Sequence, residues 1–206
     1  MSAKRLLIVN PNTDARITGW LAAEARRVAG GRFEVEAINA DSGLAALETP
    51  EHVRLAGEAV LRALRERRPD AALIAAFGDP GLAEARALGL PVAGLGEAGL
   101  RAAGVGGRRF GVVTLGAAMR EPIRAKAEGL NLVALRVLPG RIADYVAQRE
   151  SRRDEVAREV EACVEAGAEA VLLGGAPFAG EAARIASAVC LIDGVESAVE
   201  ELWRVG

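Results

Sequence analysis

The sequence repeats one pattern in its two halves. An apolar run that ends in a turn occurs at residues 4–10 (KRLLIVN) and returns at residues 108–114 (RRFGVVT). A second pair follows in the same order, at residues 70–76 (DAALIAA) and 169–175 (EAVLLGG). Internal repetition of strand-like runs predicts two similar structural units. Because helical patterns separate the runs, we expect an α/β fold of two pseudo-symmetric lobes with parallel sheets, which face one another across a cleft.

Composition is compatible with this fold and excludes several classes of function. Of the 206 residues, 51% are hydrophobic but only 3% are aromatic, so Ala, Val, Leu and Ile must build the core, as in parallel sheets covered by helices. The formal net charge is -2 and the arginines are dispersed, so we expect no nucleic-acid partner. No apolar run is long enough for a signal sequence or a membrane span. We therefore expect a cytoplasmic protein with no membrane partner.

The two cysteines predict neither a metal site nor a redox pair. Cys163 lies on the apolar stripe of a predicted helix and Cys190 begins a short apolar run, so both are expected in the core. No CxxC or other metal-ligand spacing is present. The string at residues 104–107 (GVGG) precedes a strand, whereas a dinucleotide-binding loop follows one. We therefore expect no metal and no cofactor, and interpret 104–107 as the crossover between the lobes.

Strand and helix signals alternate along the chain. Strands are expected at residues 6–9, 33–38, 71–76, 91–94, 110–113, 132–137, 170–173 and 189–192. Capping residues mark the helix starts: Asn12 or Thr13, then Thr49 before Pro50, then Asp79 before Pro80. We divide the chain into an N-terminal lobe, 1–98, and a C-terminal lobe, 99–193. The final helix, 194–206, can pack back on the first lobe.

Ligands of open parallel sheets bind outside the carboxyl ends of the strands. Four turns occupy such places, at residues 10–13, 76–81, 114–119 and 174–180. The helices that follow them direct backbone N–H groups toward one shared cleft, which favours an anion. We therefore expect a small carboxylate ligand and a gap of roughly 300 Å³ or more between the lobes.

Polar residues in the turns around this cleft are candidate binding groups, and each has an alternative structural role. Asn10, Asn12 and Thr13 either bind a carboxylate or hold the turn between strand and helix. Thr114 ends the corresponding strand of the second lobe, where a hydroxyl group can contact an anion.

Asp79, Glu181 and His52 are the titratable candidates. Asp79 either caps the helix that begins at Pro80 or has a direct chemical role. Glu181 is expected on an exposed first helical turn rather than in the site. His52 is the only histidine of the chain, and we expect it in a solvated helical turn rather than in catalysis.

The turns also carry a resemblance to a known family. Residues 9–13 (VNPNT), 76–82 (AFGDPGL) and 91–98 (PVAGLGEA) resemble the hydantoin racemase branch of the aspartate/glutamate racemase superfamily. Residues in the second half match it in the same order, at 110–114 (FGVVT), 170–174 (AVLLG) and 191–195 (LIDGV). The resemblance spans essentially the whole chain. It implies two flavodoxin-like lobes and a cofactor-independent racemase acting on amino acids or on cyclic amides of the hydantoin type.

The resemblance also implies a set of site residues. Such racemases use two cysteines on opposite faces of the substrate, one taking the α-proton and the other returning it. Here the two cysteine positions fall on Ala76 and Gly175, which carry no ionisable group. The neighbouring residues are the implied substrate contacts: Phe77, Gly78, Gly174, Ala176 and Pro177.

Three functional hypotheses follow from this combination. The first is a racemase or related isomerase without the two-thiol mechanism. The second is a lyase, decarboxylase or hydrolase that uses the same cleft through Asp79, Glu181 or a bound water. The third is a non-catalytic homologue that binds a carboxylate or regulates a partner. A homo-oligomer is compatible with all three.

Overall fold

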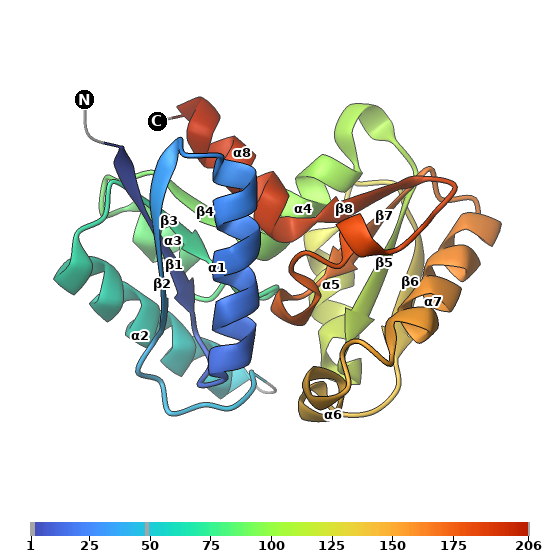
Figure 1. Ribbon diagram of the computed structural model, residues 1–206, viewed down its shortest axis with the longest axis horizontal. Coiled ribbons are helices and arrows are strands. Elements are labelled where there is room, and N and C mark those ends of the chain that lie inside the picture. The colour runs from blue at the N-terminus through green and yellow to red at the C-terminus, as the bar shows by residue number, and fades with distance from the viewer. Residues whose placement is uncertain (1–2, 48–49, 206) are drawn as a thin grey trace.

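The computed structural model describes residues 3–47 and 50–205, and places them in two lobes that lie side by side (Figure 1). Each lobe contains a four-stranded parallel sheet flanked by helices. The predicted α/β fold with two parallel sheets is therefore confirmed. Thr49, an expected helix cap, lies outside the described residues.

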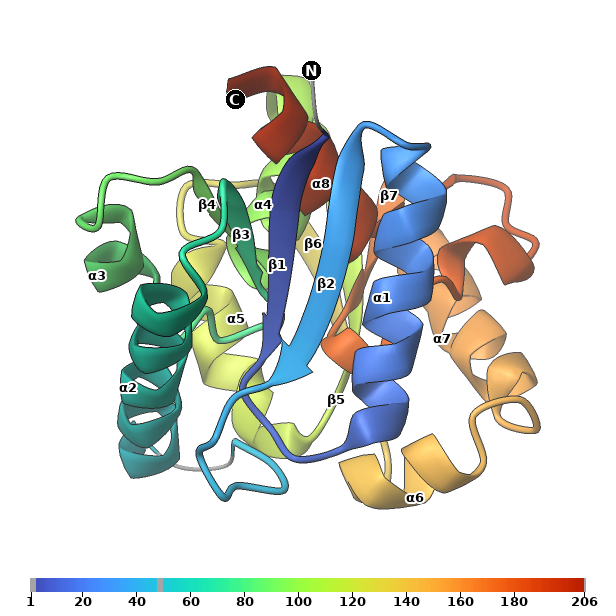
Figure 2. The ribbon, with the colours of Figure 1, turned by 60° about the vertical axis from the view of Figure 1, so that its left-hand side comes forward.

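The first lobe alternates strands and helices. Its strands are β1 (Lys4–Asn10), β2 (Phe33–Asn39), β3 (Ala71–Ile74) and β4 (Val92–Gly94), in the order β2-β1-β3-β4. Its helices are α1 (Ala15–Ala29), α2 (Pro50–Arg67), α3 (Leu82–Arg86) and α4 (Leu95–Ala103). Figure 2 shows α1 on one side of this sheet, and α2 and α3 on the other.

The second lobe repeats this scheme. Its strands are β5 (Phe110–Leu115), β6 (Leu132–Leu138), β7 (Ala170–Gly174) and β8 (Cys190–Asp193), in the order β6-β5-β7-β8. Its α-helices are α5 (Arg120–Lys126), α6 (Ile142–Ala147), α7 (Arg153–Glu165) and α8 (Gly194–Val205). Four 3₁₀ turns complete it: η1 (Val105–Gly107), η2 (Ala117–Met119), η3 (Ala176–Phe178) and η4 (Ala182–Arg184). The expected crossover at 104–107 contains η1, which connects α4 to β5.

The strand registers make the internal repeat explicit. In the first sheet, Val9 on β1 pairs with Ile74 on β3, which pairs with Gly94 on β4. In the second sheet, Val113 on β5 likewise pairs with Leu173 on β7, which pairs with Asp193 on β8. Residues that follow β3 and β7 therefore hold equivalent places in the two lobes, as the repeated sequences predict.

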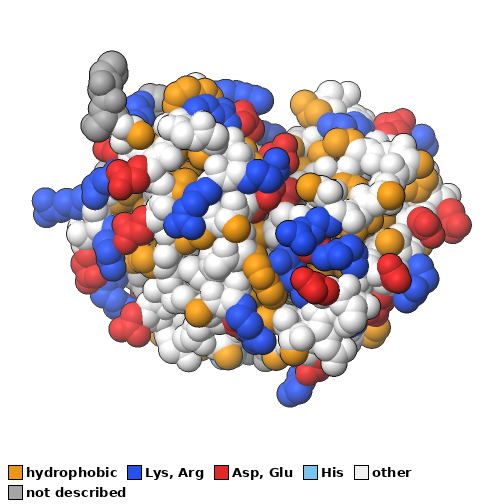
Figure 3. All heavy atoms as spheres, in the orientation of Figure 1, with side chains coloured by type: hydrophobic (Ala, Val, Ile, Leu, Met, Phe, Trp, Pro, Cys, Tyr) orange, Lys and Arg blue, Asp and Glu red, His pale blue; other side chains and the backbone are white. Residues whose placement is uncertain are grey.

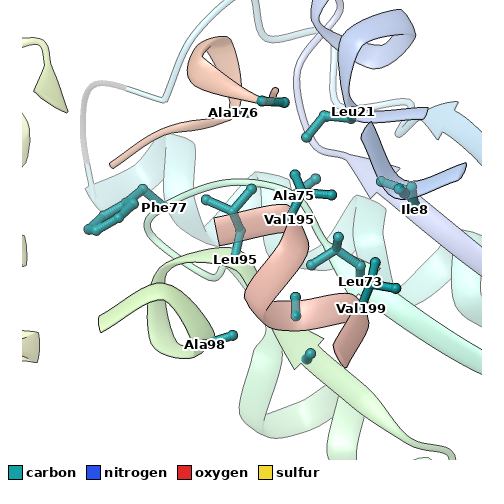
Figure 4. Close-up of a cluster of buried hydrophobic side chains, with 14 of the residues drawn as sticks. Ile8, Leu21, Leu73, Ala75, Phe77, Leu95, Ala98, Ala176, Val195 and Val199 are labelled. Carbon is teal, nitrogen blue, oxygen red and sulfur yellow. The ribbon is translucent and has the colours of Figure 1, made fainter. Parts of the chain in front are cut away.

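The two lobes share one hydrophobic core. Side chains from β1, β3, α1, α4 and α8 meet there, and Figure 4 shows Leu95 and Ala98 of α4 beside Val195 and Val199 of α8. Each fully buried Leu or Val contributes about 1.5–3 kcal/mol. Separate clusters lie under α2 and α3 in the first lobe and under α6 and α7 in the second. The relative position of the lobes is thus set by apolar packing, not by a linker.

Helix α8 lies against the first lobe. The Arg32 side chain donates to Glu200, and the Phe33 ring meets the Trp203 ring edge-on at 5.7 Å. Helix α8 therefore connects the two lobes. The boundary between the lobes at residues 98 and 99, which falls within α4, stays a prediction.

Two local expectations are corrected by the structure. Asp14, rather than Asn12 or Thr13, caps α1, because its carboxylate accepts from the backbone N–H of Arg16 at 2.9 Å. Cys190 is exposed although it begins β8, since the outer end of that strand is left uncovered. Cys163 is buried under the second sheet as expected.

Candidate functional site

A cavity lies between the lobes where the carboxyl ends of β3 and β7 meet. Its volume is about 100 Å³, well below the gap expected from sequence. Its walls are mostly apolar, since α1, the loop before α2, and the η2 and α6 segments close over it. The lining residues are Asn12, Ile17, Ala45, Ala46, Leu47, Val53, Ala75, Ala76, Phe77, Gly78, Thr114, Leu115, Met119, Ile142, Gly174, Gly175, Ala176 and Pro177.

Ala76 and Gly175 hold equivalent positions on this cavity. Ala76 comes two residues after Ile74, and Gly175 comes two residues after Leu173. Both residues line the same space, so the two places that the resemblance assigns to thiols do converge. Gly175 has φ 149° and ψ 148°, a region open almost only to glycine. A side chain at Gly175 would meet no close contact but would strain the backbone.

Phe77 forms part of the cavity wall and also joins the lobes. Phe77 is 5% exposed and belongs to the shared core, at the edge of the cluster drawn in Figure 4. A Cβ added to Gly174 would lie 2.9 Å from Cε2 of Phe77. Because Gly174 has no side chain, the Phe77 ring can reach from the first lobe to the second. The ring occupies space between the lobes, which explains part of the small cavity volume.

Two polar side chains reach the cavity, one from each lobe. The Thr114 hydroxyl donates to the carbonyl of Gly174 at 2.7 Å, so its oxygen can still accept a hydrogen bond. The Asn12 side-chain oxygen accepts from Asn10 Nδ2 at 3.0 Å and from the Asp14 N–H at 2.9 Å. Within residues 3–47 and 50–205, the Asn12 side-chain nitrogen has no acceptor.

Backbone donors add to these two groups. Among the described residues, the N–H groups of Phe77 and Ala176 have no hydrogen-bond acceptor. These amides follow Ala76 and Gly175 directly, so the two lobes present matching donors. Such paired amides suit a carboxylate or a ring carbonyl.

Two residues expected to bind ligand do not line the cavity. Asn10 is fully buried, and its side chain holds the β1–α1 turn through Asn12 and through Thr18 Oγ1 at 3.0 Å. Thr13 is exposed, and its N–H donates to the carbonyl of Leu44 at 3.0 Å. The Asn10 side chain and the Thr13 backbone N–H thus both take part in holding the turn, which is their structural alternative.

Asp79 has a role that the sequence did not suggest. It does not cap the helix beginning near Pro80; α3 begins at Leu82 and has no side-chain cap. Instead its two carboxylate oxygens accept from the N–H groups of Gly96 and Glu97, both at 2.8 Å, at the start of α4. Asp79 thus lies in the wall between lobes, and it is absent from the lining of the cavity.

The second lobe contributes a cation to the same carboxylate. Lys126 at the end of α5 lies 2.7 Å from Asp79 Oδ2. Burial raises the pKa of Asp79, and the Lys126 charge and the two amide donors oppose that rise. This carboxylate is therefore committed to holding α4 and α5 together.

Glu181 is also placed differently from expectation. It is 1% exposed, where an exposed helical turn was expected, and it pairs with Arg153 at 2.9 Å and Arg149 at 3.2 Å. These contacts lie outside the interlobe cavity. His52 is half-buried on α2 and does not line the cavity either.

The sequence missed most of the apolar lining. Ile17, Leu47, Val53, Met119 and Ile142 come from five separate segments. No motif marks them, because each reads as an ordinary apolar residue of a helix or loop. Only the approach of the two lobes brings them to one place.

Membrane-spanning helices and metal-binding clusters are both absent from the described residues. No helix in the described ranges is long and apolar enough to cross a membrane. Within the same residues, no group of three or more His, Cys, Asp or Glu side chains is placed to hold a metal ion.

Known proteins share both the sequence pattern and the fold. A sequence profile described as Asp/Glu/Hydantoin racemase matches residues 6–202. The chain belongs to this family. Hydantoin racemase from Paenarthrobacter aurescens is 32% identical to it over 206 residues, covering 94% of this chain and 87% of that protein.

Solved structures of other proteins superpose on both lobes. Allantoin racemase from Klebsiella pneumoniae gives a TM-score of 0.86 at 31% identity, over 98% of this chain and 87% of that one. Glutamate racemase from Thermus thermophilus gives a TM-score of 0.70 at 20% identity, over 99% of this chain and 80% of that one, which shows the shared fold. These relatives are racemases, and racemases are isomerases.

Proposed function

We propose that this member of the Asp/Glu/hydantoin racemase family binds a compact amino acid or cyclic amide in the interlobe cavity and does not racemise it by a two-thiol route. The observation that carries this proposal is the pair Ala76 and Gly175 at the equivalent ends of β3 and β7. A two-base racemisation needs an acid and a base on opposite faces of the substrate carbon. Neither residue can supply one.

The polar groups of the cavity support binding. The amides of Phe77 and Ala176 can donate to a carboxylate or to a ring carbonyl, and the Asn12 amide nitrogen can add a third donor. The Thr114 oxygen can accept from an ammonium group or a ring N–H. Together they match a ligand that carries both an anionic or carbonyl oxygen and an N–H.

The size of the cavity restricts the ligand. A volume of about 100 Å³ is below the roughly 300–1,000 Å³ of sites that hold drug-sized ligands. A side chain as large as that of phenylalanine does not fit unless the lobes part. We therefore expect alanine or a methyl-substituted ring to bind better than bulkier homologues.

The same cavity argues against acid–base chemistry by side chains. None of its described lining residues has a titratable side chain. The two buried carboxylates nearby, Asp79 and Glu181, are held by cations and amides elsewhere. This makes a lyase or hydrolase that uses either carboxylate the weaker hypothesis.

Family membership over residues 6–202 favours a second candidate, an isomerase acting on the same class of ligand. In that case the proton would move through a bound water, since the C5 proton of a hydantoin ring is weakly acidic because it lies next to the C4 carbonyl group. The two candidates differ in one measurable respect, which is exchange of the α-proton with solvent.

The test measures binding and exchange together. L-alanine and L-5-methylhydantoin are titrated calorimetrically, and the same samples are followed in deuterated buffer by proton NMR and circular dichroism. We expect saturable binding of at least one ligand, with loss of its α-proton signal no faster than in buffer alone. Exchange above the buffer rate by the wild-type protein would establish the isomerase instead. No binding of either ligand would contradict both.

The variant Ala76→Cys asks whether the cavity still supports the chemistry of the family. Ala76 does not have a positive φ, whereas Gly175→Cys places a side chain at φ 149°, at a cost of about 1–3 kcal/mol. A single positioned base typically gives about 10²–10⁴-fold, so Ala76→Cys should raise α-proton exchange measurably. The wild-type protein is the matched control, since it retains Cys163 and Cys190.

A further inference from the structure

A second, larger hollow lies on the molecular surface at the boundary of the two lobes. It measures about 450 Å³ and is bounded by α1 on one side and by η4 and the segment between α6 and α7 on the other. We name it the arginine groove after the three arginines in its lining, Arg149, Arg153 and Arg184. Figure 3 shows Lys and Arg side chains gathered at the boundary of the lobes on this face.

Buried Glu181 organises the floor of the arginine groove. Arg153 donates to both of its oxygens, at 2.9 and 3.4 Å, and Arg149 lies 3.2 Å from one of them. One carboxylate therefore fixes two guanidinium groups. Glu150, the only other acidic residue in the described lining, is exposed at the rim.

Arg149 is held in place from several sides. Its guanidinium lies over the Trp20 ring of α1, 4.1 Å from the ring centre, and donates to the carbonyl of Ala179. Its side chain is only 11% exposed, and its buried Nε–H has no acceptor among the described residues. Desolvation lowers the pKa of this guanidinium, against the attraction of Glu181. A charged group in this position is preorganised but incompletely satisfied.

Arg184 adds a positive charge to the groove without a carboxylate partner among the described residues. Its side chain is exposed, and no carboxylate within residues 3–47 and 50–205 forms an ion pair with it. Its charge acts unfavourably on Arg149. Like charges held together beside a hollow are stabilised by a bound anion.

We propose that the arginine groove is a binding site for a small doubly charged oxyanion, a phosphate group or a dicarboxylate. Arg184 and Arg153 contact the anion from the side open to solvent, and Arg149 with Trp20 forms the fixed inner wall. Both oxyanion types match the planar donor fork of arginine. The site is separate from the interlobe cavity, with which it shares no lining residue.

The groove joins the two lobes, so an anion there should also stabilise the molecule. Trp20 belongs to α1 of the first lobe, whereas the three arginines belong to the second. A ligand that binds only the folded state raises the unfolding temperature, and the free energy gained grows with the logarithm of 1 + [ligand]/Kd.

The test uses inorganic phosphate and malonate as separate probes, with sodium chloride at equal ionic strength as the reference. Binding is followed by tryptophan emission in Trp203→Phe, a background that leaves Trp20 as the only tryptophan. We expect a saturable change in emission and a higher unfolding temperature with at least one probe. The stronger probe identifies which oxyanion the groove prefers.

Arg184→Gln locates the effect and Arg54→Gln controls for net charge. Arg54 lies on α2 and pairs with Glu51 at 2.6 Å. It does not line the arginine groove. Loss of one charged hydrogen bond should weaken binding about tenfold or more in Arg184→Gln, with no change in Arg54→Gln. Equal weakening in both variants, or no saturable response to either probe, would overturn the proposal.

Discussion

Gly94 and Asp193 end corresponding strands of the two lobes, but only Asp193 carries a carboxylate. Asp193 accepts from the N–H of Val195 at 2.7 Å and so caps α8. At Gly94 the equivalent space is filled by Asp79, whose carboxylate lies 2.5 Å from where a Cβ would stand. In both lobes a carboxylate thus caps the helix that follows the fourth strand. Asp193 directly precedes its helix, whereas Asp79 comes from the turn after β3.

This relationship predicts that Gly94→Ala destabilises the protein. The added methyl group would overlap the Asp79 carboxylate and Leu82 Cδ2, which would lie 2.8 Å away. Overpacking of this kind costs about 1–3 kcal/mol. Urea unfolding measures the loss. Gly19→Ala is the control, because Gly19 lies within α1 with nothing near its Cβ, and this change should stabilise by about 0.5–1 kcal/mol. Equal effects of the two variants would contradict the packing argument.

Lys126→Gln should weaken the joint between the lobes. The change leaves the buried Asp79 carboxylate with only its two amide donors. Because Lys126 is 30% exposed, we discount the full cost of an unpaired buried charge to about 1–2 kcal/mol at neutral pH. The cost should shrink at low pH, where Asp79 becomes protonated. Arg124→Gln on the same helix breaks an exposed pair and should change the unfolding free energy by less than about 0.5 kcal/mol.

Asp193 should make stability fall as the pH rises. Burial, with the nearby Glu24 charge as a smaller cause, raises the pKa of Asp193 to about 6. A raised carboxyl pKa means that the folded state holds a proton that the unfolded state has released. The free energy of unfolding of the wild type, relative to Asp193→Asn, should therefore decrease between about pH 4 and 6, by at most about 3 kcal/mol.

Asp14→Asn supplies a control of opposite sign for this experiment. Hydrogen bonding to Arg16 lowers the pKa of Asp14, so its contribution is lost as the pH falls. Unfolding curves at a series of pH values for the three proteins separate the two trends. A difference between wild type and Asp193→Asn that does not vary with pH would contradict the assignment.

The two cysteines should react at very different rates. Cys190 is exposed, while Cys163 is buried and desolvation raises its pKa to about 11. Iodoacetamide should therefore modify Cys190 in the native protein and reach Cys163 only after unfolding. Peptide mass spectrometry reads the two sites separately. If the proposed function holds, this modification leaves ligand binding in the interlobe cavity unchanged.

Several features could be read from the sequence because they depend on local pattern. The repeated apolar runs gave the strands and their parallel pairing, and they placed Ala76 and Gly175 at equivalent ends. Thr114 and Asn12 reach the cavity as the strand-end argument predicts. Each of these depends on a residue's position relative to its own strand.

The burial of other residues depended on which segments of the folded chain pack against them. Cys190 was expected in the core because its run is apolar, but the described part of the chain leaves that end of β8 exposed. Glu181 looked like a surface residue, and it became buried because Arg149 and Arg153 supply its counter-charges. Hydrophobicity alone cannot predict such cases, since burial of a charge requires partners that are distant in sequence.

The sequence by itself determined the two-lobed parallel architecture, the family, and the absence of thiols at the ends of β3 and β7. These follow from periodicity and from residue identity, which need no knowledge of contacts. The tertiary structure decided the small size of the cavity, the commitment of Asp79 to α4 and Lys126, and the assembly of the arginine groove. All three are set by how closely the lobes approach, and that distance is fixed by side chains packing across the shared core.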